Sequence, residues 1–206
     1  MMFDPGIFKQ GVILQKDFFK FMDDLRKTNI ELPRTSDIFY GEVEIESDSA
    51  KVQKYEENID HKLNFREGYS LMMNEKTLLV AYDESIMKFS ALEGKAAYVS
   101  HSLVYLHQNQ YYPLNKLTLA FVTGSEKIMN KVPSAIKTNP KWGIDTTLNV
   151  EISKQKRQFL EENSYDNSIL FIDGPLIAGD GLATFRGIVK DHFLKHNILP
   201  VFLVKN

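Results

Sequence analysis

A short, continuously apolar run that ends in an aspartate is the feature that most constrains the fold. Residues 168–172 read SILFI, and Asp173 and the turn dipeptide Gly174-Pro175 follow directly. A run of this length without polar alternation is typical of a strand covered on both faces, as in an α/β sheet. A carboxylate at the tip of such a strand has no packing role, but active sites of open α/β sheets lie at these tips. Asp173 is therefore the first candidate site residue.

The same pattern occurs a second time, in front of a set of strand-like segments. The apolar stretch 77–82 leads into Asp83, and we expect a turn over 83–85. Segments 95–106 and 116–122 are rich in Val, Tyr, Leu and Thr. Strand-forming residues separated by Gly, Asn and Pro predict an antiparallel meander of three strands.

Beyond the meander, the hydrophobic periodicity predicts helix, strand, helix and strand in turn. A helix over 147–163 precedes the strand that ends at Asp173. A helix over 181–196 and a strand over 198–204 follow. Two strands joined by a helix form a right-handed βαβ crossover. The predicted fold class is therefore α/β: a mixed sheet, made of an antiparallel meander followed by βαβ, with helices packed on it.

The N-terminal part of the chain reads as helix and loop. Residues 9–27 carry apolar side chains at spacings of three and four, which predicts a helix with one buried face. The mostly charged stretch 41–57 predicts a loop or an edge hairpin. We expect one domain over 1–206, in which residues 1–75 precede a core at 77–205.

Composition excludes several classes of protein. The sequence has no cysteine, so it has no disulfide, thiolate-bound zinc, iron–sulfur cluster or cysteine nucleophile. A net charge of −2 argues against a uniformly basic nucleic-acid binder, but leaves room for a local basic groove. No stretch approaches the roughly 18 apolar residues of a membrane span, and the first residues lack the pattern of a signal peptide. We expect a cytoplasmic protein without membrane association.

Three carboxylates could converge on one site. Asp83 and Asp173 follow apolar strands, and Glu151 lies beside the inward-facing Ile152 of the helix between them. Three carboxylates form a hard, oxygen-only site that suits Mg²⁺ or Mn²⁺. Two such ions about 3.5–4 Å apart can activate water and stabilise the leaving oxygen in phosphodiester cleavage. The alternative is that Asp173 belongs to an ordinary turn and Asp83 to a loop.

Several motifs resemble those of the NurA nuclease domain. Residues 169–176, ILFIDGPL, resemble the family motif LLLDGSL or LLLDGPL. Residues 79–85, LVAYDES, are similar to the first motif, usually AVDGS, and 198–205, ILPVFLVK, look like the PVVGVSK strand. Glu151 stands in the place of the family's glutamate. The resemblance covers residues 77–205.

This resemblance implies an RNase H-like fold and a Mn²⁺- or Mg²⁺-dependent DNA exonuclease and endonuclease. Asp83, Glu151 and Asp173 would bind the metal ions, and Lys205 would neutralise phosphate charge. Members of the family act as homodimers with a hexameric HerA-type translocase ATPase in DNA end resection. DNA and that translocase are thus the expected partners.

Two departures from the family pattern favour a second interpretation of the function. Glu84 stands where the family usually has glycine, and the sequence ends at Asn206, where NurA proteins usually continue. We therefore expect a short or truncated family member. The alternative is a catalytically inactive RNase H-like adaptor that binds a HerA-type translocase or DNA.

Remaining motifs have weaker functional interpretations. A lysine-rich stretch with one tryptophan predicts a DNA-contacting surface, or an ordinary solvated face; its members are Lys127, Lys131, Lys137, Lys141 and Trp142. His192 and His196 have a spacing that can chelate metal, but a charged helix end explains them equally. Gly179 to Gly181 could bind phosphate as part of a nucleotide-binding domain, or form a simple turn before a helix.

Overall fold

The computed structural model describes residues 3–4, 11–28, 30, 65–72, 77–174 and 187–203. Its strands are β1 Gly11–Leu14, β2 Leu78–Ala91, β3 Gly94–His107, β4 Gln110–Thr123, β5 Ile136–Lys137, β6 Ser168–Asp173 and β7 Leu199–Leu203. Its helices are α1 Phe18–Lys27, α2 Phe65–Met72, α3 Glu126–Lys131, α4 Gly143–Asn163 and the π-helical turn η3 Val189–Phe193.

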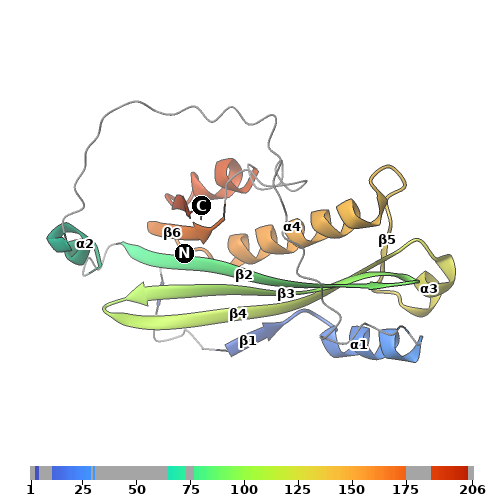
Figure 1. Cartoon of the computed structure of the whole chain (residues 1–206). Helices are drawn as coiled ribbons and strands as arrows, with labels where there is room; N and C mark the ends of the chain where they lie inside the picture. The colour runs from blue at the N-terminus through green and yellow to red at the C-terminus, as the bar shows by residue number, and fades with distance from the viewer. Residues whose placement is uncertain are drawn as a thin grey trace.

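The strands form one seven-stranded mixed sheet (Figure 1). The strand order is β1-β4-β3-β2-β6-β7, and β5 pairs with β4. The three central strands are antiparallel, whereas β6 is parallel to β2 and β7 is parallel to β6. This confirms the predicted α/β class, a meander joined to parallel strands with helices on the sheet, and it is compatible with an RNase H-like fold.

Two tight turns set the register of the meander. The β3–β4 turn, Gln108-Asn109, has φ of 48° and 62° at its two residues. Positive φ at both positions is the geometry of a two-residue hairpin turn whose twist matches that of the strands. His107 pairs with Gln110 across this turn, and Ala91 pairs with Gly94 across the β2–β3 turn. Each strand of the meander is therefore held in register over almost its whole length.

The expected turn at 83–85 is wrong, because β2 continues straight through these residues to Ala91. Its pairing with β3 runs without a break from Leu79 opposite Leu106 to Ala91 opposite Gly94. Ser85, Ile86 and Met87 each have a partner on β3. The backbone hydrogen bonds of a long hairpin therefore outweigh the local turn preference of Asp and Ser. Asp83 thus lies within a strand and not at its end.

The two faces of the sheet are covered differently (Figure 1). Helix α4 packs on one face, where Phe159 and Leu160 join Val80, Leu103 and Leu170 in the largest apolar cluster. Helix α1 packs on the other face, towards the end of the sheet that holds the β2–β3 turn. Buried apolar area of this kind contributes roughly 25 cal/mol per Å² to folding. The remainder of the α1 face carries half-exposed residues.

The N-terminal helix is shorter than expected. Residues 11–14 form β1, which pairs in parallel with β4, and α1 begins only at Phe18. Gln15 joins the two elements to the sheet: its N–H donates to the Leu117 carbonyl, and its side-chain carbonyl accepts from the Leu119 N–H. Asp17 has a left-handed φ of 59°, which interrupts any continuous helix. Within the described ranges, no helix is long and apolar enough to cross a membrane.

Gly94 gives a direct test of the hairpin register. A Cβ at this position would lie 2.3 Å from the Val122 carbonyl oxygen and 2.9 Å from the Phe121 ring. Because neither group can move without disturbing the sheet, Gly94→Ala should lower the free energy of unfolding by about 1–3 kcal/mol. Urea denaturation would measure it. Gly68→Ala is the matched control: nothing lies within 4 Å of its Cβ, so stability should stay level or rise. Equal effects would contradict the packing at Gly94.

Candidate active site

Asp83 and Asp173 lie side by side on neighbouring strands. The parallel pairing of β2 with β6 places Tyr82 opposite Ile172, and the two aspartates are the next residues of each strand. Paired strands lie about 4.8 Å apart. Tyr82 and Ile172 are buried on the α4 face, so alternation directs both aspartates to the other face. The two carboxylates that the sequence singled out are therefore brought together.

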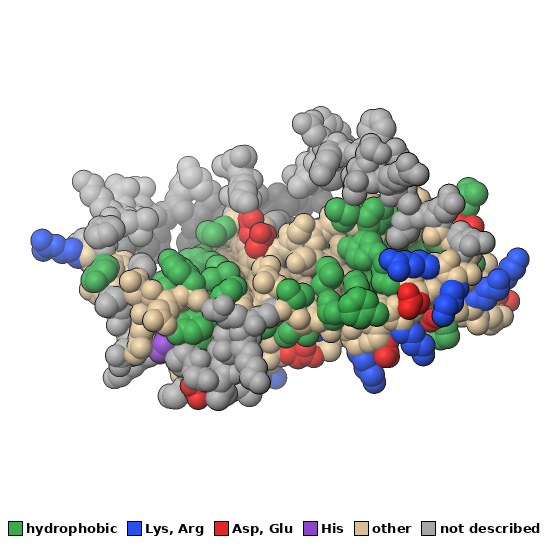
Figure 2. Space-filling view, turned by 90° about the horizontal axis from the view of Figure 1, so that it is seen from below, with side chains coloured by type: hydrophobic (Ala, Val, Ile, Leu, Met, Phe, Trp, Pro, Cys, Tyr) green, Lys and Arg blue, Asp and Glu red, His purple; other side chains and the backbone are tan. Residues whose placement is uncertain are grey.

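A row of polar side chains extends from this pair across the sheet. Asp83 pairs with Ser102 on β3, and Ser102 pairs with Asn115 on β4. The Ser102 hydroxyl donates to the Asn115 side-chain oxygen at 2.6 Å. These four residues on four adjacent strands, Asp173, Asp83, Ser102 and Asn115, are called the polar row below. All are partly or fully exposed, and Figure 2 views the molecule from this side.

Glu151 is not brought to this site. It lies on α4, on the opposite face of the sheet, where its carboxylate is 3.6 Å from Lys154 Nζ. It is also displaced along the strand, because α4 crosses β2 with Asn149 near Lys88 and Lys156 near Glu84. The predicted three-carboxylate centre therefore does not form. The pleat of β2 explains this separation. Successive side chains point to opposite faces, so Tyr82 and Glu84 face α4, whereas Asp83 faces away from α4 and therefore from Glu151.

The polar row still has the donors that a hard cation prefers. Carboxylate, amide and hydroxyl oxygens are the ligands of Mg²⁺ and Mn²⁺, and Mg²⁺ commonly uses one or two carboxylates and keeps several waters. Two adjacent aspartates fit that requirement. In the described part of the chain, no group of three His, Asp or Glu side chains could hold a metal ion. The site thus offers two carboxylates, not three.

Glu84, the residue that departs from the NurA pattern, is bound on the α4 face. Lys156 Nζ contacts its Oε1 at 2.9 Å, and the Tyr82 hydroxyl donates to its Oε2 at 3.1 Å. Lys156 also lies 5.1 Å from the centre of the Tyr82 ring. His101 Nδ1 is 2.8 Å from the same hydroxyl. Tyr82, Glu84, His101 and Lys156 are called the buried network below.

The proton positions in this network follow from the donors available. An ionised Glu84 can only accept, so the Tyr82 hydroxyl proton points towards it. The Tyr82 oxygen then accepts from His101, which must carry its proton on Nδ1. His101 Nε2 is buried and has no hydrogen-bond partner among the described residues. An unprotonated Nε2 is the less costly choice there, because a buried N–H without an acceptor loses its full solvation.

Burial perturbs both titrating members of the network. The pKa of His101 is lowered to about 4, mainly by desolvation; the charge of Glu84 opposes this shift, and those of Lys156 and Lys116 add to it. Desolvation, followed by the charge and hydrogen bond of Glu84, raises the pKa of Tyr82 well above its ordinary value. Both side chains are therefore neutral near pH 7. The only formal charges in the network are those of the Glu84–Lys156 pair.

The lysine-rich segment lies at the far end of the sheet from the polar row. Lys127 and Lys131 belong to α3, Lys137 to β5, and Lys141 precedes α4; all four are exposed, as is Trp142. In Figure 2 basic side chains gather at this end, with acidic ones between them. Lys137 lies 3.9 Å from Glu126.

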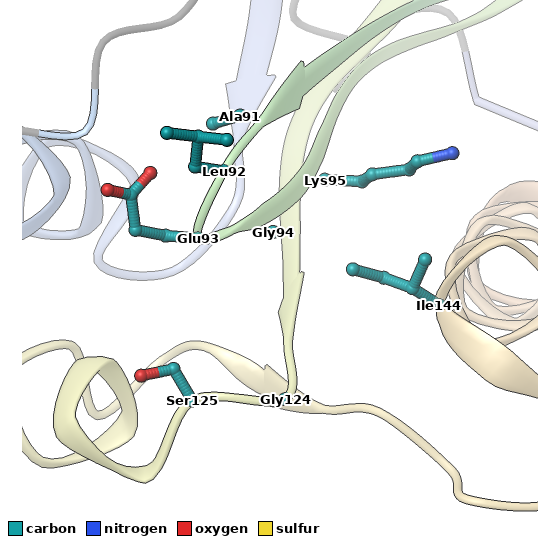
Figure 3. A pocket seen from close by; sticks show the side chains of 8 residues that line it. All are labelled: Ala91, Leu92, Glu93, Gly94, Lys95, Gly124, Ser125 and Ile144. Carbon is teal, nitrogen blue, oxygen red and sulfur yellow. The ribbon is translucent and has the colours of Figure 1, made fainter.

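An open cavity of about 730 Å³ adjoins this segment (Figure 3). Its lining includes Leu92, Glu93 and Lys95 of the β2–β3 hairpin, Ser125, and Ile144 of α4. Lys95 points towards α4 and pairs with Asp145, whereas Glu93 points away from it. Ser125 caps α3 by accepting from the Ile128 N–H. Lys95 and Ser125 thus already have partners within the protein, and the charges of Lys95 and Glu93 are opposite.

Other predicted residues lie elsewhere. Lys205 and Gly179 to Gly181 fall outside the described residues. The rings of His192 and His196 are 4.5 Å apart, and His196 Nδ1 lies 2.9 Å from an Asp166 oxygen. Ser102 and Asn115 were missed by sequence reasoning. Knowledge of the register of β2, β3 and β4 would have revealed them, because only this register places them beside Asp83.

Comparison with known proteins gives limited similarity. No protein-family model matches the chain, and no curated protein sequence matches it. A crystal structure of NurA with manganese aligns over 61% of this chain and 34% of its own, with 11% identity and a TM-score of 0.31. A second NurA crystal structure aligns over 50% and 20%, with 13% identity and a TM-score of 0.22. The chain thus spans about a third or less of these structures, and similarity this low does not define its family.

His101 predicts a dependence of stability on pH. Its pKa is about 4 in the folded chain and about 6.5 when unfolded, so between these values only the unfolded state takes up a proton. The free energy of unfolding should therefore fall by about 3 kcal/mol from pH 7 to pH 4 on account of this residue. Urea denaturation of the native chain and of His101→Gln across this range isolates the effect. The same pH dependence in both proteins would contradict it.

Proposed function

We propose that the protein is a divalent-metal-dependent nuclease of NurA type that hydrolyses phosphodiester bonds of DNA at the polar row. The observation that carries this proposal is the placement of Asp83 and Asp173 on adjacent strands, on a face that α4 leaves open. The motifs around both residues, LVAYDES and ILFIDGPL, support it. Asp173 also ends β6, and α/β folds place their sites at the carboxyl ends of parallel strands.

Asp83 and Asp173 would hold Mn²⁺ or Mg²⁺, and Ser102 and Asn115 lie beside them to bind water or phosphate oxygens. When bound, the metal supplies an activated water and charge neutralisation at the scissile phosphate. The protein itself contributes orientation: the backbone N–H of Glu84 donates to Asp83 Oδ1 at 2.8 Å, which fixes one carboxylate. Glu151 has no part in this proposal, and Lys205 keeps its predicted contact with phosphate.

The basic end of the sheet would hold the same DNA at a distance. Asp83 and Ala91 are eight residues apart on β2, which corresponds to about 26 Å. At about 3.4 Å per base pair, this distance corresponds to about eight base pairs of a duplex, which would pass over α1 where that helix covers the same face of the sheet. Backbone contacts of this kind position a substrate without reading its sequence.

The adaptor function remains the second candidate, and the position of Glu151 favours it. A nuclease centre of the type expected from the motifs uses three carboxylates, and here the third lies behind the sheet. An adaptor would keep the fold and its contacts with a HerA-type translocase, a second copy of the chain or DNA. It would lack hydrolysis.

Substitution of Asp173 separates these two functions. Asp173→Asn keeps the size of the side chain but removes the charge that binds a cation, so Mn²⁺-dependent cleavage of labelled DNA should fall at least 100-fold. Asp23→Asn, on the exposed side of α1, is the control and should cleave like the native chain. DNA binding without cleavage by the native chain in Mn²⁺ would establish the adaptor instead.

The lysine surface predicts a salt-dependent effect on binding. Four lysines are replaced by Gln: Lys127, Lys131, Lys137 and Lys141. The replacement should weaken binding of a 20-base-pair duplex. The plot of log K against log salt should also become less steep, by up to about 3–4 in slope, because fewer counterions are released. A six-base-pair duplex, too short to reach both ends, should be affected much less. Fluorescence anisotropy measures both. An unchanged slope would show that the lysines form a solvated face.

A further inference from the structure

Asp83 lies between two residues that are both held on the opposite face of the sheet. We propose that Lys156 and Tyr82 are positioning residues, which fix the Asp83 carboxylate of the polar row by anchoring Glu84 from behind. This inference rests on the proposed function, because it assigns the residues that set the metal affinity of that site. It also makes a claim about structure that can be tested without metal or DNA.

The connection runs through the backbone of Glu84. The Glu84 N–H donates to Asp83 Oδ1 at 2.8 Å, so the direction of the carboxylate depends on where the Glu84 backbone lies. The Glu84 side chain leaves that backbone towards α4, where Lys156 and Tyr82 each hold one of its oxygens. One residue thus joins the open face of the sheet to the buried network.

Anchoring is needed at this position because the strand loses a neighbour there. The pairing between β2 and β6 ends at Tyr82 opposite Ile172. From Asp83 onwards, β3 is the only described strand that pairs with β2. A strand bonded on one side depends more on its side chains to stay in place. Tyr82 and Glu84 supply that restraint on either side of Asp83.

The contacts that form the anchor are largely removed from solvent. The side chains of Lys156 and Glu84 are 16% and 24% exposed, and His101, which contacts Tyr82, is fully buried. Removing one member of a pair in such surroundings leaves the other charge without compensation. Without Lys156, the Glu84 carboxylate would turn towards water and take its backbone with it. The Asp83 carboxylate would then lose its fixed direction.

The experiment compares substitutions at two matched lysines. Lys156→Met removes the anchor, and Lys156→Arg keeps a cation within reach of Glu84. Lys116→Met is the control: Lys116 is 14% exposed on the same face, but it pairs with Glu162 of α4 at 3.4 Å. Tyr82→Phe deletes only the hydroxyl, and serves as the test if Lys156→Met does not fold. The Glu84 amide resonance in ¹H–¹⁵N spectra and Mn²⁺ affinity by calorimetry are the two readouts.

Lys156→Met should move the Glu84 amide resonance and weaken Mn²⁺ binding about tenfold or more, as the loss of supporting contacts around ligands does. Lys156→Arg should restore most of that affinity, and Lys116→Met should change neither readout. An unmoved amide and unchanged affinity in Lys156→Met would overturn the inference, as would an equal loss in Lys116→Met. If the native chain binds no Mn²⁺, the proposed function fails, while the amide readout still decides whether the anchor exists.

Discussion

The register of β2 between β3 and β6 is the constraint on which the rest of the structure depends. Each strand residue faces one side of the sheet only, so a single alignment fixes the surroundings of every side chain along β2. Tyr82 and Glu84 go into the interface with α4, and Asp83 goes to the open face. A shift by one residue would bury Asp83 and expose Tyr82. The hairpin turns and the apolar residues of β6 together prevent that shift.

The interface between α4 and the sheet combines apolar packing with polar contacts. Phe159 stacks on His101, with ring centres 5.5 Å apart, and both belong to the layer that contains Tyr82. Burial of His101, Glu84 and Lys156 would be costly alone, and the hydrogen bonds among these residues offset much of that cost. Such a network stabilises one arrangement of helix and sheet, because displaced partners would be left unsatisfied. The network thereby specifies how α4 lies on β2.

This arrangement gives Glu84 a role that its sequence position does not suggest. A charged residue directly after Asp83 reads as a possible extra metal ligand or a disturbed turn. In the structure it does neither, since it lies inside a regular strand and faces away from the polar row. The same alternation separates Glu151 from the two aspartates. The two aspartates thus lie on one face of the sheet, and Glu84 and Glu151 lie on the other.

The sequence alone determined the α/β class, the meander and the parallel strands after it, because apolar runs and turn residues are local signals. It also predicted that Asp83 and Asp173 could meet, although it took Asp83 for the end of a strand. Only the tertiary structure decided that β2 runs through Asp83, since a local turn preference is weaker than the unbroken pairing of thirteen residues of β2 with β3. Tertiary structure also decided the faces on which Glu84, Glu151, Ser102 and Asn115 lie. Register and pleat belong to pairs of strands, and no single segment encodes them.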